Sequence, residues 1–496
     1  MPTNKMTLNI MHLALLICAS CASFSSLLAQ PVLQDFANYF GNDFINSEQV
    51  LSSTTPLLSH PGNLAGRIVP AYGLFEGLAE EYRPASQNVF KMIVLLIPED
   101  QVHFTKISNG ISNLSFLNIQ MNEKKYFHFF IHPNEQESYS DLINKHLKSE
   151  EEWFATPTSS MRSLMVLNKD KTKGFIAKTS MHRQIGRYTR VIQDERAIRS
   201  VVVSDIFQSI INETNGILDG TNITWTYFPE PLSLIPNGAE GAFIAREVPD
   251  ELRENIVISW FALIANSPQG RWIDRLYKAS NYTNKKDFVW NELVYPLLRL
   301  HIELSLKNGL TTELHQQNTL LVIDPRTLKI KKLAVRDMDS HLIDHSLRRT
   351  LGKTLDLNIP FEQQAELFRY GFAQKNHWHS YSEKLRTESL EWILSQVLNP
   401  FELSEVLYMA DNELLKSFNA FFPNFAVHKP EHLPEAFKKL HNAITSPYEI
   451  LVYGDLDRKY TSTTTSDKLL NFISSTSSLV KVGLNWKYQS LCQEFF

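Results

Sequence analysis

One stretch, from residue 313 to residue 337, constrains what this chain can fold into more than any other. Two apolar runs, 319–323 and 329–335, flank a turn-forming sequence at 324–327, which predicts two β-strands joined as a hairpin. If these strands pair, six polar side chains collect at one end of the hairpin. They are Glu313, His315, Gln317, Asn318, Arg336 and Asp337.

These six side chains form a set that suits a nucleotide and a metal ion. Carboxylate and amide oxygens are ligands that Mg²⁺ prefers, while imidazole and guanidinium groups bind phosphate oxygens. The alternative is a polar hairpin end that is merely solvated, and for any single residue it is the simpler explanation. Because all six groups frame one apolar strand, we predict a nucleotide–metal site here.

An amphipathic helix is predicted just before this stretch, because apolar side chains recur there at helical spacing. The residues concerned are Trp290, Leu293, Val294, Leu297, Leu298 and His301. Pro296 should kink this helix, and Asn308-Gly309 is typical of its C-terminal end.

The order of the polar residues resembles a known signature. Glu-x-His-x-Gln-Asn from position 313, followed by Arg-Asp at 336, is similar to the motifs of the NRPS-independent siderophore synthetases, the aerobactin synthetase (IucA/IucC) family. Weaker matches precede it in the family's order: His-Pro at 60 and again at 132, Ser-x-Arg at 160, and a Lys and an Arg at 178 and 190.

The resemblance implies an α+β fold of several thumb-, fingers- and palm-like subdomains, with an antiparallel sheet region and a helical C-terminal part. It also implies an acid–amine ligase of siderophore biosynthesis, and hence a role in iron acquisition. Such an enzyme adenylates a (poly)carboxylate such as citrate with ATP and Mg²⁺ and joins it to an amine or hydroxyl. This chemistry relies on positioning and charge neutralisation and requires no protein nucleophile.

The resemblance also assigns roles to individual positions. The catalytic groups would be Arg162, Lys178, Arg190 and His315. The nucleotide would bind Ser160, Arg162, Lys178, His315, Gln317 and Asn318. The carboxylate substrate would bind His60, Arg67, His132 and Arg190, and Mg²⁺ would bind Glu313 and Asp337. For the basic stretch 171–190, a solvated surface is the alternative interpretation.

Several positions depart from the family pattern. Asn63 stands for the family's second His, Gly186 for its Thr, and no Lys precedes Arg67. Because these changes fall on the carboxylate side, the chain could use a different carboxylate, or be a catalytically degenerate, exported protein that binds a siderophore or a carboxylate. A kinase-like phosphotransferase is less compatible, since Gln317 occupies the place of the catalytic Asp and no Gly-rich loop precedes it.

Three regions are predicted along the chain: a signal-like or helical segment 1–30, an N-terminal region 31–255, and a palm-like region 256–496 that carries the hairpin and a helical end. Strands are expected at 92–97, 127–131 and 175–179, and helices at 201–211 and 250–265. Further helices are expected within 360–420, separated at Asn399-Pro400. His341 and His345 could share a helix face, but without a third ligand they do not indicate a metal site.

Composition limits the classes of partner. A net charge of −4 without a long basic run argues against nucleic acid, and 43% hydrophobic residues with 21% charged residues argue against stable membrane insertion. A homodimer is compatible with the sequence. The apolar stretch 10–29 resembles a secretory signal cleaved after Ala29, or else a buried N-terminal helix. Because the enzyme would need ATP, we predict a cytoplasmic protein, with export as the alternative.

Overall fold

The computed structural model describes residues 30–51, 56–58, 68–70, 78–107, 113–160, 162–185, 188–267, 269–353 and 377–444. The predictions for the segment 1–29, for His60, for Arg67 and for Gly186 concern residues outside these ranges. Within the ranges, no helix combines the length and the apolar character that crossing a membrane requires.

The largest sheet in this part of the chain has seven antiparallel strands. Their order is β3 (Phe90–Lys91), β9 (Trp153–Pro157), β10 (Ser163–Asn168), β11 (Gly174–Thr179), β16 (Phe243–Arg246), β15 (Leu232–Pro236) and β5 (Val102–Ile107). Successive side chains point to opposite faces, so Leu164 and Val166 of β10 enter one hydrophobic core and Met165 and Leu167 enter another. The sheet is therefore buried on both faces.

A second sheet covers one face of the first. It consists of β6 (Asn118–Met121), β7 (Lys124–Ile131), β4 (Ile93–Pro98) and β8 (Leu147–Lys148), and it confirms the strands predicted at 92–97 and 127–131. The core between the two sheets is rich in aromatic rings; Phe130, for example, meets Phe175 edge-on with ring centroids 5.1 Å apart. We call this aromatic cluster the outer core.

The opposite face of the seven-stranded sheet packs on a third sheet and on two short helices, α2 (Leu33–Phe40) and α3 (Asn42–Asn46). The order of the third sheet is β14 (Thr224–Tyr227), β20 (Ile330–Val335), β19 (Thr319–Ile323) and β17 (Ile256–Ser259). The core at this face, which we call the inner core, includes Phe44, Met165 and Leu320. Since β14 pairs in parallel with β20, the predicted division at residue 255 runs between strands of a single sheet.

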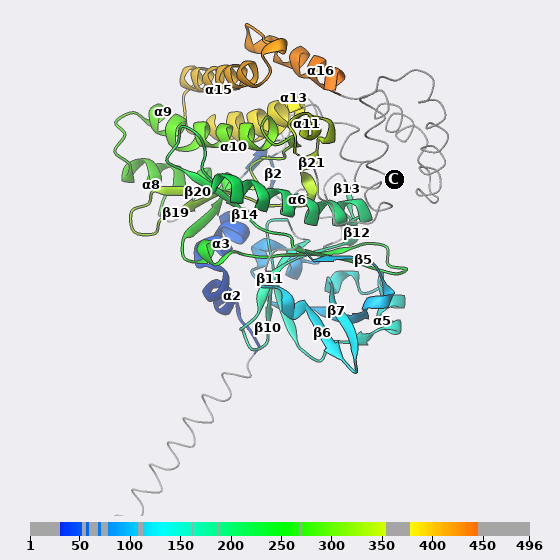
Figure 1. The fold of residues 1–496 in the computed structure, drawn as a ribbon. Coiled ribbons are helices and arrows are strands. Elements are labelled where there is room, and N and C mark those ends of the chain that lie inside the picture. The colour runs from blue at the N-terminus through cyan, green and yellow to red at the C-terminus, as the bar shows by residue number, and fades with distance from the viewer. Residues whose placement is uncertain are drawn as a thin grey trace, which may run out of the picture.

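Helices cover the far side of the third sheet and complete the C-terminal part (Figure 1). The longer ones are α6 (Asp194–Thr214), α8 (Trp272–Ala279), α10 (Tyr295–Ser305), α15 (Pro400–Phe421) and α16 (Leu433–Ile444). Short helices are α5 (Ser140–Lys145), α7 (Asp250–Arg253), α9 (Lys285–Phe288), α11 (His345–Thr350), α13 (His377–His379) and α14 (Trp392–Leu394), and two-stranded pairs are β1 (Pro56–Leu58) with β2 (Ile68–Pro70), β12 (Met181–Ile185) with β13 (Tyr188–Arg190), and β18 (Leu310–Thr311) with β21 (Leu342–Ile343).

The predicted hairpin at 319–335 is confirmed, because β19 and β20 pair antiparallel from Thr319 opposite Val335. The mixed α+β fold is confirmed as well. The predicted helix at 201–211 lies within the longer α6. The helix expected around Pro296 is a stretch of π-helix, Val289–Val294, followed by α10, and Pro296 lies in the first turn of α10.

One predicted helix is wrong. The stretch 250–265 contains the single turn α7, then strand β17, then a 3₁₀ turn from Trp260 to Ile264. Its apolar run 256–259 forms β17, which pairs with β19. One edge of β19 is paired with β20, and the backbone groups on its other edge find their hydrogen-bond partners in β17. His341 and His345 share no helix either, since His341 precedes β21 and His345 begins α11.

Candidate functional site

The pairing register of the seven-stranded sheet places three polar residues on one face. Lys178 of β11 lies opposite Ser163 of β10 on one side and opposite Ile244 of β16 on the other. Arg246 of β16 lies opposite Ile176, two residues before Lys178. Directly paired residues share a face, and so do residues two apart in a strand. Ser163, Lys178 and Arg246 therefore all point toward the third sheet.

The hairpin end brings the acidic partners to this face. Asp337 follows β20 with φ +72° and ψ 58°, a left-handed conformation that is uncommon outside glycine, and it starts a 3₁₀ turn from Met338 to Ser340. The Ser340 hydroxyl donates to the Asp337 carbonyl at 2.6 Å, and the Asn318 amide donates to the Ser340 Oγ at 3.3 Å. Asn318 thus shapes the loop that presents Asp337.

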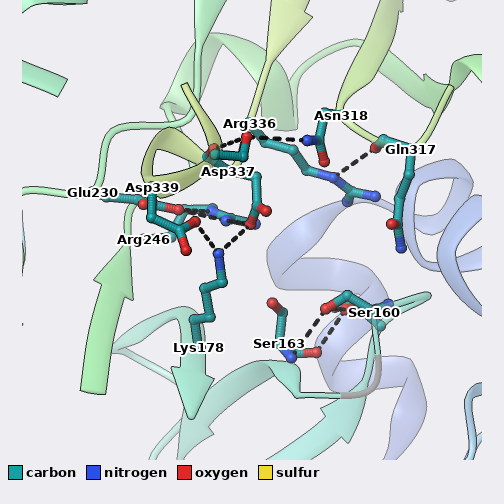
Figure 2. A network of polar contacts seen from close by, with 12 residues as sticks. Ser160, Ser163, Lys178, Glu230, Arg246, Gln317, Asn318, Arg336, Asp337 and Asp339 are labelled. Carbon is teal, nitrogen blue, oxygen red and sulfur yellow. Dashed lines mark hydrogen bonds and ion pairs between the residues drawn. The ribbon is translucent and has the colours of Figure 1, made fainter. Parts of the chain in front are cut away.

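A buried ion-pair network joins the two sheets at this point (Figure 2). Lys178 Nζ donates to Asp337 Oδ1 at 2.6 Å and also to Asp339 Oδ1. Arg246 Nη2 donates to Asp337 Oδ1 at 2.7 Å, and its Nε donates to Glu230 Oε1 at 2.9 Å. The side chains of Lys178 and Asp339 are each 1% exposed. The hairpin end is therefore fixed to the sheet by charge pairs.

Burial and charge act in opposite directions on these carboxyl groups. Burial alone would raise the pKa of Asp337, but the charges of Lys178 and Arg246 outweigh it and hold that pKa well below its usual range. Burial would likewise raise the pKa of Asp339, but the charge of Lys178 opposes this and the pKa is lowered. At Glu230, burial outweighs the attraction of Arg246 and the pKa is raised. Asp337 and Asp339 are consequently ionised at neutral pH.

Three further arginines surround the network. Arg199 of α6 donates from Nε to the Asp339 carbonyl at 2.8 Å, and Arg196 Nη1 lies 3.9 Å from Asp339 Oδ2. Arg162 is buried and donates from Nη1 to the Arg190 carbonyl at 3.2 Å. With Lys178 and Arg246, these arginines place five cationic side chains in and around the network, and the carboxylates of Glu195 and Glu313 also act on Arg199.

A second network lies beside the first and centres on the hydroxyl of Ser159. This Oγ donates to Glu48 Oε2 at 2.7 Å and accepts from Gln317 Nε2 at 3.3 Å and from Arg336 Nη2 at 3.2 Å. The turn that contains Ser160 and Arg162 therefore contacts the hairpin end directly. Ser160 Oγ accepts from the Ser163 amide at 3.1 Å within that turn.

His315 and Glu313 lie on the loop that enters β19. The Gln317 amide donates to His315 Nδ1 at 3.2 Å, which leaves Nε2 as the ring donor. Burial lowers the pKa of His315, so its imidazole is neutral at neutral pH. Its Nε2 lies 4.0 Å from Glu313 Oε2, and the Glu313 side chain is 38% exposed. Glu313 is thus the more accessible carboxylate of the predicted pair.

The carboxylates that could hold a cation differ from the predicted pair. Within the described ranges, Glu230, Asp337 and Asp339 each offer an oxygen within 4.8 Å of the other two, whereas Glu313 is not part of this group. Oxygen donors of this kind suit Mg²⁺, so the residues present fit the ion that the resemblance implies. In this structure the same oxygens are paired with Lys178 and Arg246.

His132 lies away from this cluster, at the end of β7. Its ring is fully buried beside Tyr82, with centroids 4.9 Å apart, and its Nδ1 accepts from the Asn134 amide at 3.1 Å. Burial lowers the pKa of His132 to about 3. The ring therefore caps a turn and offers no exposed surface to the predicted carboxylate substrate.

Several residues of the site escaped the sequence motifs. They are Glu48, Arg199, Glu230, Arg246 and Asp339. For Asp339, the spacing of two residues from Asp337 is a local indication, because both could belong to one turn. The others come from distant segments, and no local pattern distinguishes them from ordinary surface charges.

No protein-family model and no curated protein matches this sequence. Among solved structures, the chain is similar to the petrobactin biosynthesis protein AsbB from Bacillus anthracis str. Sterne, with a TM-score of 0.54, 14% identity, and coverage of 84% of this chain and 74% of that one. It is also similar to the aerobactin synthetase IucC from a hypervirulent pathotype of Klebsiella pneumoniae, with a TM-score of 0.51, 13% identity, and coverage of 72% and 68%. The chain thus has the fold of the siderophore synthetases, as its motifs predicted.

Proposed function

We propose that this chain is an ATP-dependent ligase of the siderophore-synthetase type, which adenylates a (poly)carboxylate such as citrate and condenses it with an amine or hydroxyl. One observation carries the proposal. Ser159, next to the predicted nucleotide residues Ser160 and Arg162, is in hydrogen-bond contact with Gln317 and Arg336 of the hairpin end. This contact between two motifs far apart in sequence supports a shared nucleotide site.

The nucleotide phosphates would bind Arg162, Lys178, the Ser160 hydroxyl and the Nε2–H of His315, with Gln317 and Asn318 orienting the loop. Lys178 must then exchange at least one carboxylate for a phosphate. Asp337 and Asp339 are now paired with Lys178, and they would become available to Mg²⁺ once Lys178 binds a phosphate. Glu230 lies near them, and Glu313 stays a predicted ligand. When bound, Mg²⁺ neutralises phosphate charge.

In the first step a substrate carboxylate oxygen would attack the α-phosphorus of ATP, and the bond to the pyrophosphate oxygen would break. In the second, the amine or hydroxyl would attack the acyl carbon, AMP would leave with the bonding electron pair, and the nucleophile would lose its proton. Buried cations can neutralise the charge that moves to pyrophosphate. Arg190, His60 and Arg67 remain the candidates for the carboxylate substrate, whereas the buried ring of His132 offers it no surface.

The test is carboxylate-dependent ATP–pyrophosphate exchange across a panel of di- and tricarboxylic acids. We expect exchange with at least one acid, and a loss of about a hundredfold or more in Arg162→Ala and in His315→Ala. Arg326→Ala, in the exposed turn at the other end of the hairpin, and His428→Ala, on the surface, are matched controls that should keep full exchange. Exchange that persists in both site variants would refute the assignment.

A degenerate binding protein is the second candidate, because Asn63 and Gly186 replace residues of the family's carboxylate side. It would bind a siderophore or carboxylate, release no pyrophosphate and be exported. Cell fractionation with N-terminal sequencing separates the two candidates. A mature chain that starts at Gln30 outside the cytoplasm would favour the binding protein.

A further inference from the structure

Three consecutive polar residues near the N-terminus, Ser47, Glu48 and Gln49, are completely buried. They occupy a π-helical turn, Ser47–Leu51, that follows α3. Buried polar side chains are costly unless they are hydrogen-bonded, and π-helical turns occur frequently at functional sites. The contacts of these three side chains therefore indicate what this turn does.

Ser47 and Gln49 attach the turn to the third sheet and to the seven-stranded sheet, respectively. Ser47 Oγ accepts from the Ser259 amide of β17 at 2.9 Å. Gln49 Nε2 donates to Thr156 Oγ1 at 2.7 Å and to the Pro157 carbonyl at 2.9 Å, at the end of β9. The turn thus bridges the third sheet and the seven-stranded sheet.

Glu48, between them, reaches the proposed nucleotide site. Its Oε2 accepts from the amide and the hydroxyl of Ser159 at 3.1 and 2.7 Å. Its Oε1 accepts from Arg336 Nη1 at 2.8 Å and from Ser259 Oγ at 2.7 Å. One carboxylate therefore holds both the turn before Arg162 and the arginine that precedes Asp337.

The hydroxyl of Ser159 has no capacity left for a ligand. A serine hydroxyl offers one donor and two acceptor sites, and Glu48, Gln317 and Arg336 use all three. Ser159 consequently links Glu48 to the hairpin end, while the neighbouring Ser160 stays half-buried and closer to solvent. A change at Glu48 should therefore shift the whole Ser159–Arg162 turn.

We propose that Glu48 is a positioning residue of the nucleotide site, which sets the Ser159–Arg162 turn against the Arg336–Asp337 hairpin end. This inference rests on the proposed function. Because Glu48 is fully buried, it would act on a ligand through Ser159 and Arg336. Displacements of about 1 Å in such a frame can cost about a hundredfold in rate.

Glu48→Gln tests the proposal with minimal change of shape. An amide can present its oxygen to only one side, so its NH₂ must face either the Ser159 amide and hydroxyl or the Arg336 guanidinium, all of which donate. We expect the dissociation constant for Mg·ATP to rise about tenfold or more. Amide hydrogen exchange should also quicken in the peptide that contains Ser159 and Arg162, measured without nucleotide.

Ser259→Ala is the matched control. It removes one hydrogen bond to the same Glu48 oxygen but leaves the contacts of Glu48 with Ser159 and Arg336 in place. Nucleotide affinity and exchange in the Ser159 peptide should stay within about twofold of the parent chain. The double variant Glu48→Gln/Ser159→Ala should lose no more affinity than the weaker-binding single variant, because both changes break the same link.

The outcomes separate this inference from the proposed function. Glu48→Gln could lower thermal stability and still match Ser259→Ala in nucleotide affinity and in amide hydrogen exchange of the Ser159 peptide. In that case Glu48 is only structural and the inference is overturned. Fully additive losses in the double variant would also overturn it. If the parent chain binds no Mg·ATP, the proposed function fails, while faster exchange of the peptide in Glu48→Gln alone would still support positioning by Glu48.

Discussion

Lys178 is the residue at which the two sheets that carry the site meet. Its ammonium group is buried and lies between two carboxylates from the hairpin end. Removing an ion from water costs several kcal/mol, and only good geometry and close opposite charges offset this cost. Lys178 therefore stabilises the fold through Asp337 and Asp339 in addition to its proposed role in binding phosphate.

Lys178→Met should lower the free energy of unfolding by about 3–5 kcal/mol, because it leaves Asp339 buried without its main counter-charge. The double variant Lys178→Met/Asp339→Asn should recover part of this loss, since the uncompensated charge is gone. Urea unfolding of the single and double variants measures both effects.

The matched control is Lys332→Met. It breaks the half-exposed ion pair between Lys332 of β20 and Glu251 of α7. Pairs of this kind contribute about 0–1 kcal/mol, so this variant should unfold close to the parent chain. Equal unfolding midpoints for Lys178→Met and Lys332→Met would contradict a stabilising role of the buried network.

At the scale of single elements, the start of α15 shows local sequence acting alone. The Asn399 side chain accepts from the amides of Phe401 and Glu402, each at 3.0 Å, and Glu402 Oε2 accepts in return from the Asn399 amide at 3.2 Å. Pro400 follows at the first helical position, where its missing N–H costs nothing. The break predicted at Asn399-Pro400 is confirmed for this reason.

Asn399→Ala should cost about 1 kcal/mol of stability, because two amides at the helix start lose their acceptor. Asn412→Ala, in the middle of the same helix, is the control and should change stability by less than about 0.5 kcal/mol. Chemical denaturation followed by circular dichroism compares the two. A smaller loss in Asn399→Ala than in Asn412→Ala would show that the cap does not limit this helix.

The element at 256–259 shows where local sequence fails. A short apolar run is compatible with a buried strand and with a buried helix, and the sequence predicts one helix that starts at Asp250. The structure uses that start for a single turn only. The run itself pairs with β19, so a partner some 60 residues away in sequence decided its conformation.

At the scale of the whole molecule, the inner core determines how the halves of the site face each other. It combines side chains of the seven-stranded sheet, the third sheet and the N-terminal helices. The outer core packs the seven-stranded sheet on the β4–β7 sheet and contributes nothing to the hairpin end. The two cores should therefore differ in their effect on ligand binding, even where they contribute equally to stability.

Phe44 of the inner core and Phe129 of the outer core allow a matched test, since they are 2% and 1% exposed. Phe44→Ala and Phe129→Ala should each cost about 3–5 kcal/mol through lost burial and a new cavity. Only Phe44→Ala should also weaken Mg·ATP binding, because the Phe44 carbonyl accepts a hydrogen bond from the amide of Ser47, which begins the turn that holds Glu48. Binding titrations under conditions where both variants remain folded check this, and equal affinities would contradict it.

The sequence by itself determined what depends on neighbours along the chain. Alternating or continuous apolar runs, turn formers and capping residues predicted the hairpin at 319–335 and the start of α15, because the interactions concerned span only a few residues. The resemblance of the motifs also predicts that Lys178, Arg162 and Asp337 belong to one site. What they contact could not be predicted from spacing.

The tertiary structure alone decided the partners across long separations. Glu48 is 111 residues from Ser159 and 288 residues from Arg336, and Lys178 is 161 residues from Asp339. Such contacts arise from strand register and from the packing of the inner core, which no local pattern encodes. A buried charge is stable only where that packing supplies its counter-charge, and for this reason the folded chain, not its motifs, defines the site.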